Sequence, residues 1–284
     1  MPVTSDGSTF VSHSNDGDGD CAGNIKKIPA KDWSNDSQRS VSNGQIPQVP
    51  HTHAYYTEGY AIMNEYQVAL GESTCTAIFR GTGNQRLDIV DLGQLGLERA
   101  RSALEAVSIM GNLSYEYGYR DAGESLIVTD PKEAYIFHVL PDDTGYHSIW
   151  VAMRVPDGHV TAVMNAFVIR KISLSDSNNF LYSANLPKVA ESLGWDPRSG
   201  NKIDFTAVFS GVNEGSCKYS SGRRMWAVYN ALAPSAGLSP YYSDYTTASP
   251  YPATIRPDQK GNCAYPFLLL RCCCCYLKSM RPSL

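Results

Sequence analysis

Two short apolar runs on either side of a polar turn are the clearest pattern in this chain. They span residues 59–74 and flank Asn64-Glu65. In a strand every second residue points to the same face, and here apolar residues occupy both faces of the two runs. This predicts a β-hairpin that is covered on both faces and therefore central in its sheet. One set consists of Tyr60, Ile62, Val68 and Leu70, and the other of Ala61, Met63 and Ala69.

Asn64 is the polar residue that ends the first of these strands. An amide N–H at a strand end can be aimed at a bound substrate, as an oxyanion stabiliser requires. The alternative is a plain hairpin in which Asn64 only supplies turn geometry, because Asn is common in tight turns. The hairpin alone favours this second interpretation.

Around the hairpin the pattern predicts helices and antiparallel strands. Residues 4–45 are rich in Ser, Asn, Asp and Gly, so loops are expected there. The spacing of apolar residues between 87 and 117 is helical and predicts one or two helices that cover the sheet. The ranges 125–129, 135–140, 148–155 and 160–169 are predicted to form an antiparallel meander, and the ranges 186–193 and 224–232 to form helices. This order favours an α+β layered fold.

Composition limits the classes of partner. The chain has 284 residues, 43% of them hydrophobic, and a formal net charge of −4, so it carries no general excess of basic residues. A nucleic-acid partner is therefore not expected, and small or peptidic partners are. The apolar run 267–270 is followed by Arg271 and is too short to span a membrane.

The eight cysteines do not form a disulfide framework. Cys21, Cys75, Cys217 and Cys263 are scattered, and Cys272 to Cys275 form one block. A reducing compartment, intracellular and cytoplasmic, is the expected location. A targeting signal stays possible if the start of the protein lies upstream.

Several short motifs in order along the chain carry a resemblance to a known family. They are Asp6-Gly7-Ser8-Thr9, Ile46-Pro47-Gln48-Val49-Pro50-His51, Asn64-Glu65, Glu124-Ser125-Leu126-Ile127-Val128-Thr129-Asp130, Trp150-Val151-Ala152, Arg154-Val155-Pro156-Asp157, Arg223-Arg224-Met225-Trp226 and Tyr251-Pro252-Ala253-Thr254-Ile255-Arg256-Pro257-Asp258. Spread over roughly nine tenths of the chain, they are similar to those of the PepD-type dipeptidases, although each alone is weak.

The resemblance implies a fold and an activity. PepD-type dipeptidases are N-terminal-nucleophile (Ntn) cysteine hydrolases of the secernin/dipeptidase superfamily. Residues 1–260 are therefore expected to form a four-layer αββα sandwich that acts on short peptides without a cofactor or metal. In this family the nucleophile is a first-residue Cys whose own α-amine is the base. Residues 1–5, which precede Asp6, contain no Cys, so the nucleophile strand is expected to be absent and the chain to be inactive.

Site residues follow from the resemblance one at a time. Asp16 matches the acidic residue that orients the terminal amine, while His13 stands where many members have Arg. Asn64 matches an oxyanion stabiliser. Asn165 and Arg224 are weaker matches to polar residues of the same site; an ordinary strand-end hydrogen bonder is the alternative for Asn165, and a surface or carboxylate-paired arginine for Arg224.

Other candidate chemistry is disfavoured. Cys21 and Cys75 lie far from a free amine and are poor replacements for the nucleophile. Residues 16–20 resemble the start of an EF-hand loop but lack its Gly and Glu. His51-Thr52-His53 offers two metal ligands, yet no third lies close in sequence, so no metal site is predicted.

The chain departs from the family after Lys260. Clustered cysteines beside apolar residues could be acylated, but the abrupt change in composition favours translated intron or frameshifted sequence at 261–284 outside the fold. Two alternatives to a dipeptidase stay open. One is a non-catalytic, secernin-like binding or trafficking protein, and the other is a fragment that does not fold stably.

Overall fold

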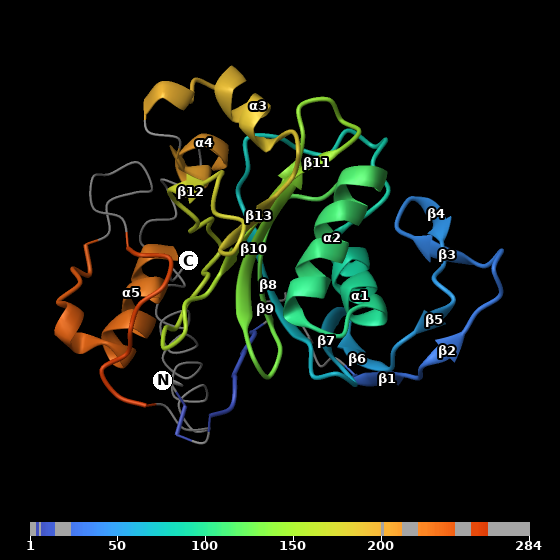
Figure 1. Cartoon of the computed structure of the whole chain (residues 1–284), viewed down its shortest axis with the longest axis horizontal. Helices are drawn as coiled ribbons and strands as arrows, with labels where there is room; N and C mark the ends of the chain where they lie inside the picture. The colour runs from blue at the N-terminus through green and yellow to red at the C-terminus, as the bar shows by residue number, and fades with distance from the viewer. Residues whose placement is uncertain are drawn as a thin grey trace, which may run out of the picture.

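One antiparallel sheet of eight strands organises the molecule (Figure 1). The computed structural model describes residues 4, 5, 7–14, 24–199, 202–211, 221–241 and 251–260. In spatial order the strands are β1 (Lys26–Ile28), β6 (Tyr55–Glu58), β7 (Tyr60–Asn64), β8 (Ala69–Cys75), β9 (Gly123–Thr129), β10 (Ala134–Pro141), β11 (Ser148–Arg154) and β13 (Phe180–Tyr182). Three two-stranded pairs lie outside it: β2 (Lys31–Asp32) with β5 (His51–Thr52), β3 (Gln38–Val41) with β4 (Gly44–Pro47), and β12 (Ile172–Ser173) with β14 (Lys202–Ile203).

Helices cover both faces of the sheet. Helices α1 (Ile89–Arg99) and α2 (Ala103–Tyr117) lie on one side, and α4 (Phe205–Phe209) and α5 (Ser221–Leu232) on the other (Figure 1). The remaining helices are α3 (Leu186–Ser192) and the short 3₁₀ turns Pro197–Ser199 and Pro234–Ala236. Each face buries its own hydrophobic core. Among the described residues no helix combines the length and apolar composition that crossing a membrane requires.

The sequence specifies where α1 and α2 begin. The Asp88 side chain accepts a hydrogen bond from the Asp91 N–H, and the Asp91 carboxylate accepts one from the Asp88 N–H, which is a capping box. Ser102 caps α2 by a single bond, in which its hydroxyl oxygen accepts from the Glu105 N–H. The helical spacing of apolar residues between 87 and 117 is thus divided into two helices, because Ser102 starts a second helix within it.

Most predicted elements are confirmed, whereas the predicted faces of the hairpin are not. The strands β7 and β8, the meander β9 to β11 and the helices α3 and α5 lie where the pattern placed them. However, Ala61 is buried in the same core as Val68 and Leu70, and Met63 is 38% exposed. The reason is that β7 and β8 pair at one position only, Met63 with Ala69. The alternation of side chains between the two faces in β7 therefore does not continue in register into β8.

The predicted strand at 160–169 is wrong. Only Val160 makes a β-bridge, with Ile255. Further along, the main-chain N–H groups bond to side chains: that of Asn165 to Ser73, and those of Val168 and Ile169 to His138. The segment is apolar because it is buried in the core beneath the sheet.

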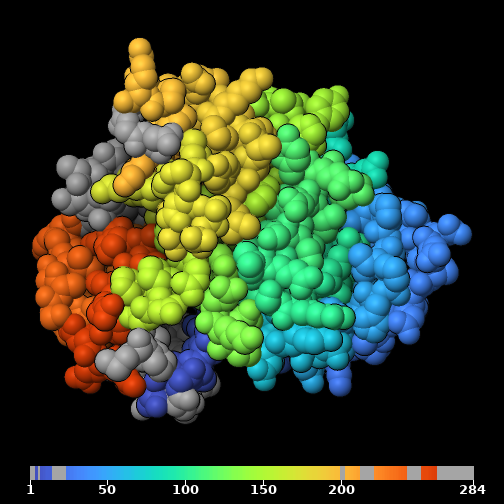
Figure 2. All heavy atoms as spheres, in the orientation of Figure 1, coloured from blue at the N-terminus to red at the C-terminus, as the bar shows by residue number. Residues whose placement is uncertain are grey.

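The four-layer αββα arrangement stays a prediction. The described residues form an α+β fold with one large sheet between two helical layers. Figure 2 shows the blue segment that carries β2 to β5 at one flank and the orange and red residues 221–241 and 251–260 at the opposite flank. The prediction that residues 261–284 lie outside the fold concerns residues that the structure does not describe.

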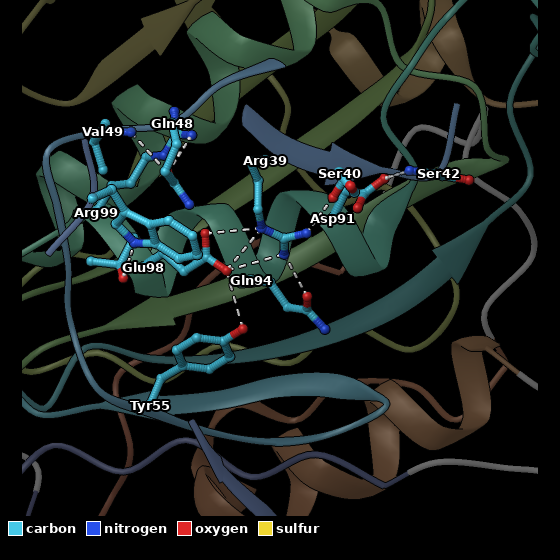
Figure 3. A network of polar contacts seen from close by, with 12 residues as sticks. Arg39, Ser40, Ser42, Gln48, Val49, Tyr55, Asp91, Gln94, Glu98 and Arg99 are labelled. Atoms are coloured by element: carbon cyan, nitrogen blue, oxygen red, sulfur yellow. Dashed lines mark hydrogen bonds and ion pairs between the residues drawn. The ribbon is translucent and has the colours of Figure 1, made fainter. Parts of the chain in front are cut away.

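A polar network joins the β3–β4 hairpin to α1 (Figure 3). The Arg39 guanidinium donates from Nε to both carboxylate oxygens of Glu98, at 3.1 and 3.2 Å, and from Nη2 to Gln94 at 2.8 Å. Tyr55 donates its hydroxyl to Glu98 at 3.2 Å. Nearby, the Ser42 N–H donates to Asp91 at 2.7 Å. Because Glu98 is buried, these partners replace the water that its charge would otherwise require.

Candidate functional site

Asn165 and Arg224 form the centre of the candidate site. Arg224 donates from Nη2 to Asn165 Oδ1 at 2.8 Å, and Asn165 donates from Nδ2 to the Thr74 carbonyl at 2.8 Å. The Asn165 N–H donates to Ser73 Oγ at 2.8 Å. Arg224 comes from α5, Asn165 from the irregular segment, and Ser73 and Thr74 from β8. Three distant parts of the chain thus hold one amide in a fixed orientation.

The backbone of Asn165 supports a special role for this position. Its φ is +57°, in the left-handed region that non-glycine residues seldom adopt. Asn tolerates this region better than most side chains, and such conformations are frequent at functional sites. The second hydrogen of Nδ2 has no acceptor among the described residues. It is the natural donor for a bound molecule.

The N-terminal segment reaches the same strand. A Cβ at Gly71 would lie 3.1 Å from His13 Cβ and 3.6 Å from Val11, so residues 11–13 run beside β8. His13 Nε2 lies 3.3 Å from a carboxylate oxygen of Glu72, and its ring packs edge-on against Tyr60 of β7. The segment therefore lies where β7 and β8 diverge.

Consecutive residues of β8 join the two halves of the site. Glu72 contacts the N-terminal segment, while Ser73 and Thr74 contact Asn165. Glu72 uses its carboxylate and Ser73 its hydroxyl, from opposite faces of the strand, whereas Thr74 uses its main-chain carbonyl. The site thus combines residues 11–13, β8, the segment around Asn165 and the first turns of α5.

A pair of carboxyl groups is buried beside this strand. Glu124 of β9 is 1% exposed, and one oxygen of Glu124 and one of Glu72 have no hydrogen-bond partner among the described residues. Burial first, and then the neighbouring Glu72 carboxyl, raise the pKa of Glu124 far above its ordinary value. Glu124 is therefore a neutral acid at pH 7 beside the Glu72 carboxyl.

Replacing Glu124 by glutamine is expected to stabilise the protein above neutral pH. The native state keeps the Glu124 proton, whereas the unfolded chain releases it above about pH 4.3. The free energy of unfolding therefore falls by up to about 1.4 kcal/mol for each unit by which the pH rises. Glutamine cannot lose a proton in this range, so the variant does not have this pH-dependent loss of stability. Urea unfolding at pH 6, 7 and 8 should show a Glu124→Gln advantage that grows with pH. Glu116→Gln, at an exposed position of α2, is the matched control, and an advantage independent of pH would contradict the neutral acid.

Comparison with known proteins decides the family. The sequence profile of peptidase family C69 matches residues 3–262. The chain belongs to this peptidase family. A probable dipeptidase of Latilactobacillus sakei is 27% identical to it over 150 residues, which are 53% of this chain and 30% of that protein. The match spans less than a third of that relative's length.

Asn64 does not lie with the other residues of the candidate site. Its Nδ2 donates to the carbonyls of Leu97 and Ala100, at 2.9 and 2.7 Å, and its Oδ1 accepts from Tyr66 and Val68, both at 3.0 Å. Both amide hydrogens are thus used by the end of α1. The oxyanion role stays a prediction, and the observed contacts are those of a structural turn residue.

Distance along β8 also separates Asn64 from Asn165. Val68, which bonds to Asn64, and Ser73, which bonds to Asn165, are five residues apart in an extended strand, or roughly 16 Å. Asp16 lies outside the described residues, as do Cys21 and residues 261–284. Of the four predicted site residues, the structure therefore brings together Asn165 and Arg224.

A buried Ser–His pair resembles a catalytic arrangement but has the wrong proton placement. His138 Nε2 accepts from the Val168 and Ile169 N–H groups at 2.9 and 3.2 Å, so its proton must be on Nδ1, which lies 2.7 Å from Ser125 Oγ. Cys75 Sγ lies 3.1 Å from the same hydroxyl. Since Nδ1 donates to Ser125, His138 cannot take a proton from Ser125 or, through it, from Cys75. This array is a structural part of the C69 core.

Sequence reasoning missed Glu72, Ser73, Thr74 and Glu124. Ser73 and Thr74 act through contacts with residue 165, some ninety positions away in sequence, and no local pattern shows them. Glu124 had a usable signal. It is the one charged residue of β9, Gly123–Thr129, and a charged residue is seldom buried without a partner.

Proposed function

We propose that this chain belongs to a dipeptidase of the Ntn cysteine type and that Asn165 and Arg224 contact the peptide substrate. The observation that carries the proposal is the Asn165 amide. It is oriented by Arg224 and by Thr74 and retains one N–H for a ligand. The family, a peptidase family, and the relative described as a probable dipeptidase support the substrate class.

The chemistry requires a donor where negative charge develops. A cysteine thiolate attacks the carbonyl carbon of the peptide bond, its S–C bond forms, and the C=O electron pair moves to oxygen. The tetrahedral oxyanion then collapses and expels the amine, which takes the proton from the base. A preorganised amide N–H stabilises that oxyanion without reorganisation. Arg224, hydrogen-bonded to Asn165 Oδ1, polarises the amide and strengthens its donor.

The N-terminal segment would bring the nucleophile to this place. Residues 11–13 run beside β8 within a few residues of Thr74, the strand residue that holds Asn165. Residues 1–5 contain no cysteine. We therefore expect residues 1–284 by themselves to bind dipeptides without cleaving them. Hydrolysis by the purified chain would refute this part of the proposal.

Dipeptide binding to the full chain tests the proposal without requiring a nucleophile. Arg224→Ala should weaken binding by about 10- to 100-fold, because a hydrogen bond to a charged group contributes roughly 1.5–3 kcal/mol. Isothermal titration calorimetry with a panel of neutral dipeptides measures the change. Arg198→Ala, an arginine whose side chain is 90% exposed, should bind like the parent.

Two results would contradict the proposal. One is equal affinity of the parent and Arg224→Ala for dipeptides that the parent binds. The other is the absence of binding by a parent chain that unfolds cooperatively. That second result would favour the non-catalytic alternative. Arg224→Lys keeps the positive charge and loses the planar guanidinium. Its dipeptide affinity therefore shows whether binding depends on the guanidinium geometry or on the charge alone.

A further inference from the structure

Two histidines and a glutamate converge at the turn that follows β7. One ligand atom each from His51, His53 and Glu65 lies within 4.8 Å of the others. The histidines belong to β5 and the residue after it, while Glu65 belongs to the hairpin turn, so the fold supplies the third ligand that the local sequence lacked. The group lies outside the proposed peptidase site, at the other end of β8.

An unpartnered buried nitrogen points to a ligand at this place. His53 is 5% exposed, and its Nδ1 has no hydrogen-bond partner among the described residues. That nitrogen lies 3.9 Å from Glu65 Oε1, beyond hydrogen-bond range. A buried polar atom left without a partner is unfavourable, and a metal ion between the two groups would supply that partner.

The distances suit a small metal ion. Ligands with bonds of about 2.0–2.2 Å in tetrahedral geometry lie roughly 3.4 Å apart. The 3.9 Å between His53 and Glu65 needs only a small movement to reach this value. Glu65, whose side chain is 44% exposed, is free to make it. Its Oε1 accepts from the Ala54 N–H, which holds the carboxylate toward the histidines.

The residues around the two histidines make contacts that are typical of metal-binding histidines. His51 Nδ1 lies 2.6 Å from the Asp32 carboxylate, which fixes the ring by one nitrogen and leaves the other for a metal. Tyr66 packs edge-on against His53, with ring centroids 4.7 Å apart. Charged groups also surround His53. Arg101 opposes a cation there, whereas Glu65 and Glu105 favour one.

We propose that His51, His53 and Glu65 bind one Zn²⁺ ion, with water as the fourth ligand. Imidazole and carboxylate together are typical zinc ligands, while Mg²⁺ and Ca²⁺ prefer oxygen ligands alone. The ion joins β5 to the β7–β8 turn. Three protein ligands leave one coordination position open to solvent.

Zinc titration of the full chain tests the site. Cys272, Cys273, Cys274 and Cys275 are replaced by serine in every sample, because thiolates would also bind zinc. After treatment with a chelator and its removal, calorimetry with ZnCl₂ should give one tight equivalent, and zinc should raise the midpoint of thermal unfolding, since it binds the native state. MgCl₂ should do neither.

Exposed ligands provide variants that should not disturb folding. His51→Ala and Glu65→Gln should each weaken zinc binding by at least about 10-fold and remove the thermal shift, while their metal-free midpoints match the parent. His159→Ala removes a histidine outside the cluster and should bind like the parent. The proposal is overturned if the parent takes up no zinc, or if both ligand variants bind zinc as tightly as the parent.

Discussion

Replacing Asn64 by alanine is expected to lower the free energy of unfolding by roughly 3–5 kcal/mol. The Asn64 side chain is 3% exposed and makes four hydrogen bonds to main-chain groups. Alanine would leave two carbonyls at the end of α1 and two N–H groups of the turn without this partner. Urea unfolding followed by circular dichroism measures the loss.

Two further variants make this test specific. Asn178→Ala, at an exposed position, should change stability by less than about 0.5 kcal/mol. Asn64→Asp keeps the acceptor oxygen but replaces the Nδ2 donor by a second carboxylate oxygen against the carbonyls of Leu97 and Ala100, so it should destabilise as well. Parent-like stability of Asn64→Ala would show that these bonds do not hold α1 to the turn, and would return Asn64 to the candidate site residues.

Acid is expected to destabilise the protein through His138. The side chain is completely buried among Ser125, Phe167 and Phe205, and burial lowers its pKa to about 3. Unfolded histidine takes up a proton below about pH 6.5, whereas the native side chain does not. This term is absent above pH 6.5 and lowers the free energy of unfolding by about 3 kcal/mol between pH 7 and pH 4.

Comparison with a non-titrating side chain isolates the histidine term. His138→Gln keeps a donor and an acceptor of similar reach and cannot be protonated in this range. Its free energy of unfolding should fall less steeply than that of the parent between pH 7 and pH 4. Parallel curves for parent and variant would mean that native His138 accepts a proton freely, which would contradict the burial and the proton placement.

The sequence alone predicted the elements that depend on local pattern. The meander β9 to β11 and the helices α1 and α2 follow from periodicity and turn residues, and each is confirmed. The segment 160–169 failed because its apolar residues suggest a strand, while its main chain bonds to the side chains of Ser73 and His138. Whether an N–H pairs with a strand or with a side chain depends on residues distant in sequence.

The same limit applies to the sites. Resemblance to a family gave Asn165 and Arg224, which the structure joins by a hydrogen bond, but it also gave Asn64, whose contacts are with α1. The sequence predicts no metal site at His51 and His53, because no third ligand lies nearby in sequence. Glu65 reaches them only because the hairpin turn folds back on β5. In each case the contacts between residues distant in sequence, rather than their spacing along the chain, determine which residues lie together.

A crystal structure of residues 1–284 with a bound dipeptide would test the central claim most directly. We predict an intact peptide with a polar atom about 3 Å from Asn165 Nδ2, in contact with the segment around residues 11–13 and near the guanidinium of Arg224. A dipeptide bound elsewhere, with the Asn165 amide unengaged, would contradict the assignment of this site to peptide hydrolysis.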